Sequence, residues 1–187
     1  MYDADGRRYL DAYNNVPVVG HCHPEVVARI SKQAATLNTH TRYITDGPTE
    51  LAERLPATVP RELTSVTFTC TGSESNDLAV RISKAATGGT GFIVTDSAYH
   101  GTTETLSGMS PVTGVATGPD VFTVAAPIGE QNASQFGARV RTCIETMRNA
   151  GVKPAALLVD TIFGSDGVMA HPVGFLAAAV DDCARRN

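Results

Sequence analysis

The tripeptide Thr71-Gly72-Ser73 lies between a strand-like and a helix-like segment and is the strongest local indication of a binding site. The first N–H groups of a helix lack intrahelical acceptors and carry a partial positive charge. Gly72 allows close approach to the backbone and Ser73 adds a hydroxyl donor, so the pattern suits a phosphate group. The alternative, that Ser73 only caps its own helix, stays open. Because neither Gly-x-Gly-x-x-Gly nor the Gly-Lys-Ser/Thr pattern occurs, the phosphate would belong to neither a dinucleotide nor a nucleoside triphosphate.

Two further candidates follow strand-like segments, where the carboxyl ends of parallel strands place loops that face ligands. Tyr99-His100-Gly101 follows residues 92–95, and an aromatic ring at such a point can stack on a flat heterocycle. Asp160 ends the segment 156–159, where an acid can face a ligand. Simpler alternatives are equally open: Tyr99 can anchor its loop, and Asp160 can cap the next turn.

Two other kinds of chemistry are disfavoured. His21-Cys22-His23 supplies at most part of a metal coordination shell, and a loop leading into a helix explains it better, so we expect no metal site. Ser73, His100 and Asp160 are the residue types of a hydrolytic triad. However, Ser73 lacks the Gly-x-Ser-x-Gly turn that would expose a nucleophile.

The elements that must position these residues alternate between strand and helix patterns. This alternation is typical of an α/β fold with a mainly parallel sheet and flanking helices. The pattern predicts strands over residues 65–69, 92–95, 121–125 and 156–159, and helices over residues 74–86, 134–150 and 172–186.

The N-terminal part and one long connection complete the prediction. A short strand or extended arm over residues 8–13 precedes an amphipathic helix that His23-Pro24 opens. A second helix follows residues 46–48 and ends before Pro60. Residues 101–120 are rich in Gly, Ser, Thr and Pro, which predicts a long loop of the kind that borders active sites.

Composition narrows the class of protein. With 187 residues, 42% hydrophobic and 18% charged residues and a net charge of −4, the chain has the composition of a soluble globular domain. It has no basic stripe for nucleic acid and no apolar run near the roughly 20 residues of a membrane span. The four cysteines are scattered and form no Cys-x-x-Cys, which favours free thiols in a reducing cytoplasm.

Taken together, four motifs resemble one family, the class III aminotransferases of the fold type I pyridoxal-phosphate enzymes. The motifs are residues 5–11 (Asp-Gly-Arg-Arg-Tyr-Leu-Asp), 20–24 (Gly-His-Cys-His-Pro), 71–77 (Thr-Gly-Ser-Glu-Ser-Asn-Asp) and 98–101 (Ala-Tyr-His-Gly). Their order and spacing match over nearly the whole chain. Residues 14–16 and 37–39 further resemble the branch that contains alanine–glyoxylate aminotransferase-like and phosphoethanolamine phospho-lyase proteins.

The resemblance implies pyridoxal 5'-phosphate as cofactor and carries the family's binding roles to matching positions. Gly72 and Ser73 would hold the phosphate, Asn76 would brace that loop, and Tyr99 would stack on the pyridine ring. His100 lies beside Tyr99. Asp160 stands where many members have a glutamate, and Ser75 replaces the usual alanine. The implied cofactor-binding residues are Gly72, Ser73, Asn76, Tyr99, His100 and Asp160.

The family's Schiff-base lysine and the aspartate that pairs with the pyridine nitrogen have no counterpart here. The lysines Lys32, Lys84 and Lys153 do not stand in the expected context. We therefore expect a chain truncated before the Schiff-base lysine, with no catalytic residue of its own. Residues 1–47 would be an N-terminal segment with a short strand and a helix, and residues 48–187 the first part of the cofactor-binding large domain.

The function implied by the resemblance is amino-group transfer between an amine or amino acid and a keto acid, in a homodimer. This chain alone should be inactive. Two alternatives stay open: a phospho-lyase of the same family, and a non-catalytic binding remnant. We expect no nucleic-acid or membrane partner.

Overall fold

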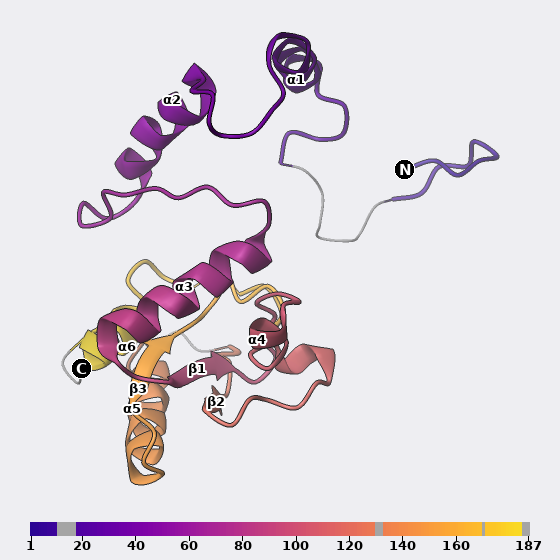
Figure 1. Cartoon of the computed structure of the whole chain (residues 1–187). Coiled ribbons are helices and arrows are strands. Elements are labelled where there is room, and N and C mark those ends of the chain that lie inside the picture. The colour runs from indigo at the N-terminus through magenta and orange to yellow at the C-terminus, as the bar shows by residue number, and fades with distance from the viewer. Residues whose placement is uncertain (11–17, 130–132, 170, 185–187) are drawn as a thin grey trace. The chain divides into compact units, whose positions relative to one another are not determined.

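The computed structural model describes residues 1–10, 18–129, 133–169 and 171–184 (Figure 1). The chain divides into two units, Met1–Val66 and Thr67–Asn187, each of which is described by itself.

The first unit contains two helices, α1 (Pro24–Thr36) and α2 (Asp46–Arg54), and the 3-10 helix η1 (Leu55–Thr58). Pro24 opens α1 as predicted, because the first N–H of a helix needs no intrahelical acceptor. Of the predicted strand or extended arm over residues 8–13, residues 11–13 lie outside the described residues. Arg8 forms a single antiparallel bridge with Tyr2, so residues 8–10 form no strand, and the alternative of an extended arm stays open.

The second unit is built on a parallel sheet of β1 (Gly91–Thr95), β2 (Val121–Val124) and β3 (Pro154–Leu157), in the order β2-β1-β3. All five residues of the central strand β1 are buried, as expected for a parallel strand covered on both faces. The predicted α/β class, a parallel sheet with flanking helices, is confirmed.

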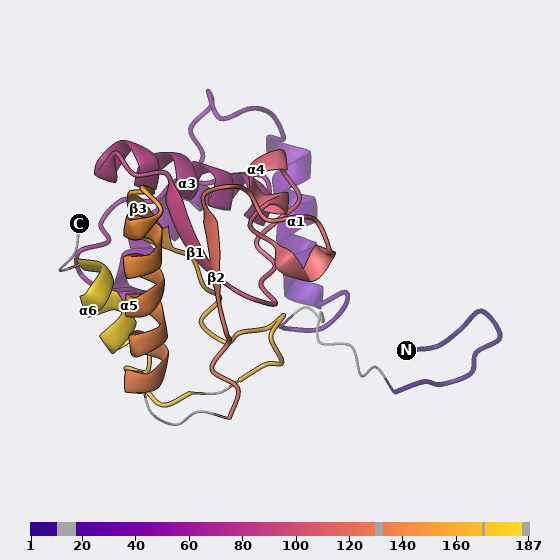
Figure 2. The same cartoon turned by 90° about the horizontal axis from the view of Figure 1, so that it is seen from below.

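The helices of this unit are α3 (Gly72–Thr87), α4 (Glu104–Ser107), α5 (Ala133–Asn149) and α6 (Ala177–Ala184), together with the 3-10 helix η2 (Pro111–Thr113). Figures 1 and 2 show α3 on one side of the strands and α5 on the other. Successive residues of β1 pack on opposite faces of the sheet. Ile93 packs in the hydrophobic cluster that contains Phe136 of α5, and Phe92 packs in the cluster that contains Val80 of α3.

Three predictions about elements need correction. Residues 65–69 pair with no strand among the described residues, because β-branched side chains favour extended backbone but a strand also needs a partner. The last helix begins at Ala177 rather than at residue 172, since Gly174 has a left-handed φ of 81° that a helix cannot contain. The predicted loop 101–120 contains α4 and η2.

Within the described ranges, every helix is too short or too polar to cross a membrane.

Candidate functional site

The start of α3 is capped by Thr71, not by Ser73. The Thr71 hydroxyl oxygen accepts a hydrogen bond from the Glu74 N–H at 3.1 Å, and the Glu74 carboxylate accepts one from the Cys70 N–H at 2.7 Å. This reciprocal arrangement resembles a capping box and satisfies the N–H groups of Cys70 and Glu74. The alternative use of Ser73, as the cap of its own helix, is therefore excluded.

Ser73 retains hydrogen-bond donors that have no acceptor among the described residues. Its hydroxyl oxygen accepts a hydrogen bond from the Thr102 N–H at 3.2 Å, and no described residue accepts its own hydroxyl hydrogen. The backbone N–H groups of Gly72 and Ser73 likewise have no acceptor among the described residues. No atom lies within 4 Å of the position that a Cβ on Gly72 would take. Three donors at the positive end of a 16-residue helix can therefore hold an anion.

The loop after β1 is fastened to this end of α3. The Asn76 side-chain amide donates to the His100 carbonyl at 2.8 Å. Gly101 is buried with a φ of 142°, and a Cβ there would lie 2.7 Å from the Ser73 hydroxyl oxygen. Only glycine fits this approach, so the loop and the helix start form one structure.

His100 and Tyr99 differ sharply in exposure. His100 is only 8% exposed, and burial lowers the pKa of its imidazole. A hydrogen bond to the Leu158 carbonyl and the charges of Asp160 and Asp166 partly oppose that shift. Nε2 of His100 is buried without a partner among the described residues. Tyr99 is 50% exposed, which leaves ring surface for a ligand to stack on.

Asp160 is exposed and caps its own turn. Its carboxylate accepts hydrogen bonds from the Ile162 N–H at 3.1 Å and the Gly164 N–H at 2.7 Å. Its charge also acts on His100, so the ends of β1 and β3 share one electrostatic environment. The capping alternative for Asp160 is thus observed, and among the described residues no hydrogen bond joins Asp160 to Ser73, Asn76 or Tyr99.

The structure adds residues that the sequence reasoning missed. Ser110 is fully buried, and its hydroxyl oxygen accepts a hydrogen bond from the His100 N–H at 2.9 Å. The Thr95 hydroxyl at the end of β1 donates to Asp166 at 2.9 Å, and burial raises the pKa of the Asp166 carboxyl. Ser110 and Asp166 belong to Gly- and Ser-containing connections, where the sequence alone offers no periodic pattern to distinguish them.

Neither a metal site nor a hydrolytic triad is present among the described residues. No three His, Cys, Asp or Glu side chains there lie close enough to hold a metal ion. Ser73 bonds to the Thr102 N–H and Asp160 to its own turn, and no hydrogen bond among the described residues joins Ser73, His100 and Asp160, so these three side chains form no proton relay.

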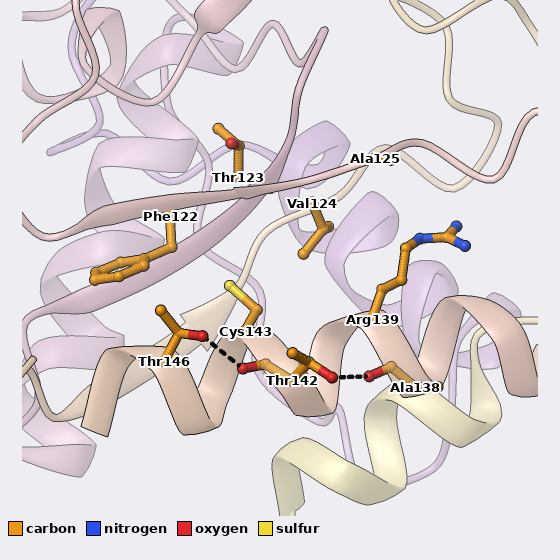
Figure 3. Close-up of a pocket in the computed structure, with 9 residues that line it drawn as sticks. All are labelled: Phe122, Thr123, Val124, Ala125, Ala138, Arg139, Thr142, Cys143 and Thr146. Atoms are coloured by element: carbon orange, nitrogen blue, oxygen red, sulfur yellow. Dashed lines mark hydrogen bonds between the residues drawn. The ribbon is translucent and has the colours of Figure 1, made fainter. Parts of the chain in front are cut away.

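A separate hollow of about 460 Å³ lies between β2 and α5, and it contains none of the predicted site residues (Figure 3). Its walls include Phe122, Val124 and Cys143. The hydroxyls of Thr142 and Thr146 donate to carbonyls of their own helix at 3.1 and 3.0 Å. These two hydroxyls are therefore engaged within their own helix.

Comparisons with known proteins agree with one another. A family model described as aminotransferase class-III matches residues 1–187. The chain is 31% identical to the alanine–glyoxylate aminotransferase 2-like protein of Drosophila melanogaster, covering 97% of this chain and 40% of that protein. It is 42% identical to ethanolamine-phosphate phospho-lyase homolog 1 of Caenorhabditis elegans over 111 residues, which are 59% of this chain and 24% of that protein.

Solved structures show the same similarity. A phospholyase from Arthrobacter in complex with phosphoethanolamine matches with a TM-score of 0.84 and 35% identity, over 98% of this chain and 46% of that chain. A PMP-bound aminotransferase from Vibrio fluvialis matches with a TM-score of 0.76 and 25% identity, over 99% of this chain and 46% of that chain. The chain thus spans less than half the length of these relatives.

Proposed function

Since this chain belongs to the class III aminotransferase family, we propose that it supplies the phosphate-binding and ring-stacking residues of a pyridoxal-phosphate-dependent aminotransferase. The whole protein would transfer an amino group between an amine or amino acid and a keto acid. The proposal goes beyond the family assignment, because the matched relatives are more than twice as long as this chain.

The observation that carries the proposal is the group of three unused donors at the start of α3. Two N–H groups and the Ser73 hydroxyl suit a phosphate, and the half-exposed Tyr99 ring on the adjoining loop suits a flat heterocycle. A pyridine ring that carries a phosphate combines both features. The residues present therefore fit pyridoxal 5'-phosphate.

The proposed roles follow from these contacts. Gly72 and Ser73 hold the phosphate, and Tyr99 stacks on the ring. Asn76 keeps the His100 carbonyl, and with it the loop, against α3. Asp160 and the buried, neutral His100 shape the electrostatics beside the ring. When bound, pyridoxal phosphate withdraws electrons from the substrate carbon that carries the amino group.

The proposal is tested on the polypeptide as its source cell produces it. Amines and amino acids are supplied with a keto acid and pyridoxal phosphate, and formation of the new amino acid is followed. We expect amino transfer that needs both the cofactor and the keto acid. Absence of transfer with every donor, in a preparation that binds the cofactor, would contradict an aminotransferase.

We also propose that the 187-residue chain alone does not transaminate. Lys153 donates to the Thr87 carbonyl and Lys84 lies over the Phe92 ring, both near the C-terminal end of α3 and away from Ser73. Lys32 belongs to α1 of the other unit. The purified chain is mixed with the cofactor and substrates. Reproducible turnover by the purified chain would contradict this proposal.

A phospho-lyase is the second candidate, and two of the comparisons favour it. The relative with 42% identity is named an ethanolamine-phosphate phospho-lyase homolog, and the structure with a TM-score of 0.84 is a phospholyase bound to phosphoethanolamine. Release of inorganic phosphate from phosphoethanolamine, without need for a keto acid, would identify this activity. Its absence beside efficient amino transfer would remove the candidate.

We propose a homodimer in a reducing compartment such as the cytoplasm. The described residues of Met1–Val66 include no buried residue, and the α1 side chains Val26, Val27 and Ile30 are 44, 48 and 63% exposed, which supports association. All four cysteines are free thiols. Sedimentation of the source-cell polypeptide as a monomer at micromolar concentration would contradict the dimer.

A further inference from the structure

We propose that Ser110 is a positioning residue of the cofactor site: its buried hydroxyl holds the peptide that joins Tyr99 to His100, and so sets the place of the Tyr99 ring. This inference rests on the proposed function. Ser110 belongs to none of the sequence motifs that identified the other site residues. Its place beside them is seen only in the folded structure.

The hydroxyl of Ser110 has a defined orientation. Its oxygen lies 2.7 Å from the Leu106 carbonyl oxygen and 3.3 Å from the Gly101 carbonyl oxygen, and 2.9 Å from the His100 nitrogen. A hydroxyl has one hydrogen to donate, and the shorter distance assigns it mainly to Leu106. A lone pair therefore faces the His100 N–H and accepts its hydrogen.

Ser110 completes a set of three side chains that hold His100 and Thr102 of the loop. Asn76 donates to the His100 carbonyl at 2.8 Å and Ser73 accepts from the Thr102 N–H at 3.2 Å, both from α3. Ser110 holds the His100 N–H from the segment between α4 and η2. The loop is thus fixed from two directions.

Loss of the Ser110 hydroxyl would act selectively on the ring. The His100 N–H would remain buried without an acceptor, which is unfavourable, so the Tyr99–His100 peptide would shift to find another partner. The donors for the phosphate are the N–H groups of Gly72 and Ser73 and the Ser73 hydroxyl, all on α3, and Ser110 forms its hydrogen bonds with His100, Leu106 and Gly101 instead. A positioning role therefore predicts weaker ring binding with phosphate binding retained.

The test uses two probes and the polypeptide as its source cell produces it. The first probe, 4'-deoxypyridoxine 5'-phosphate, has the ring and the phosphate but no aldehyde, so its binding does not involve a lysine. The second probe is inorganic phosphate. Calorimetric titrations compare the unmodified protein with Ser110→Ala, Ser110→Cys and the matched control Ser107→Ala. Ser107 lies on α4 in the same segment and is not part of the site.

We expect Ser110→Ala and Ser110→Cys to bind the ring probe about tenfold more weakly, with inorganic phosphate affinity unchanged within about twofold. Ser107→Ala should bind both probes normally. The near-ultraviolet circular dichroism of the bound ring probe should also change in the Ser110 variants, because the stacked tyrosine has moved.

Other outcomes overturn the proposal. Equal weakening of both probes, loss of the thermal unfolding transition in both Ser110 variants, or unchanged ring affinity would make Ser110 a residue of the fold alone. These outcomes leave the proposed function standing, since the unmodified protein still binds the ring probe. Failure of the unmodified protein to bind the ring probe would overturn the proposed function together with this inference.

Discussion

The role of the Ser73 hydroxyl depends on the nearby residue Thr71. Both threonine and serine favour the N-cap position, and in this chain Thr71 occupies it. Ser73, two residues further on, accepts a hydrogen bond from the Thr102 N–H, and no described residue accepts its own hydroxyl hydrogen. A shift of two residues along the chain therefore separates the hydroxyl that caps α3 from the hydroxyl that we propose as an anion donor.

Replacing Ser73 with alanine should weaken the binding of inorganic phosphate by about tenfold, since one hydrogen bond to a charged oxygen is lost. Ser83→Ala is the matched control, because Ser83 lies on the same helix and donates to the Ala79 carbonyl instead. Titration calorimetry measures both variants. An equal effect of the two substitutions would show that helix stability, and not the donor at Ser73, controls phosphate binding.

The buried His100 should make stability depend on pH. Burial lowers its pKa, so the folded state binds a proton less readily than the unfolded state, in which the pKa is near 6.5. The contribution of neutral His100 is therefore present above about pH 6.5 and is lost as pH falls through the lower folded pKa.

The free energy of unfolding of the protein should thus decline more between pH 7.5 and 5 than that of a His100→Gln variant, as measured in urea. Asp166 has a raised pKa and contributes in the opposite sense, since its stabilising protonated form is lost as pH rises. Because Asp166 is present in both proteins, the comparison removes its contribution. Parallel pH profiles would contradict a role for His100.

At the scale of elements, the parallel sheet brings the loops of the site together. β1 and β3 are adjacent and parallel, so the loop after β1 and the turn after β3 leave the same edge of the sheet. This arrangement explains why Asp160 and Asp166 act on His100 although about 60 residues separate them in the chain. The central position of β1 makes its loop the natural place for the site.

Substituting Gly101 with alanine should cost about 3 kcal/mol of stability, because the added methyl group meets Ser73 at 2.7 Å and the φ of 142° is strained for alanine. The control is Gly114→Ala, at a φ of 74° with open space around it, where about 1 kcal/mol is expected from the backbone alone. Urea unfolding measures both. Equal losses would mean that the close approach of loop and helix does not contribute.

At the scale of the whole molecule, the buried core belongs to one unit. Both hydrophobic clusters lie within residues 80–179, whereas the described part of residues 1–66 contains no buried side chain. The structural division falls after Val66. The boundary between residues 47 and 48, which the resemblance implies, stays a prediction about how the whole protein is organised.

We expect a polypeptide of residues 67–187 to unfold cooperatively on heating and a polypeptide of residues 1–66 to remain without a transition. Burial of apolar surface drives folding, and the described residues of the first unit bury no side chain among themselves. Circular dichroism during heating tests each polypeptide. A sharp transition in residues 1–66 would contradict this division of the core.

Residue pattern was enough to predict the α/β class, a strand over residues 92–95 and a helix over residues 74–86, which the structure gives as Gly91–Thr95 and Gly72–Thr87. Anion binding at the start of that helix stays a prediction. The predicted class, strand and helix depend on period and on local backbone chemistry, which neighbouring residues carry. The segment 65–69 shows the limit of such reasoning. Its side chains favour a strand, but among the described residues it has no partner, and propensity cannot supply one.

Only the tertiary structure shows which of these residues are joined by hydrogen bonds. Thr71 rather than Ser73 caps α3, Ser110 accepts from His100, and Asp166 joins the ends of β1 and β3. Each of these depends on hydrogen-bond distances, and the bond from Thr95 to Asp166 joins residues that are 71 positions apart. A hydroxyl or a carboxylate takes its role from the groups that packing brings within about 3 Å of it, and residue order does not record that distance.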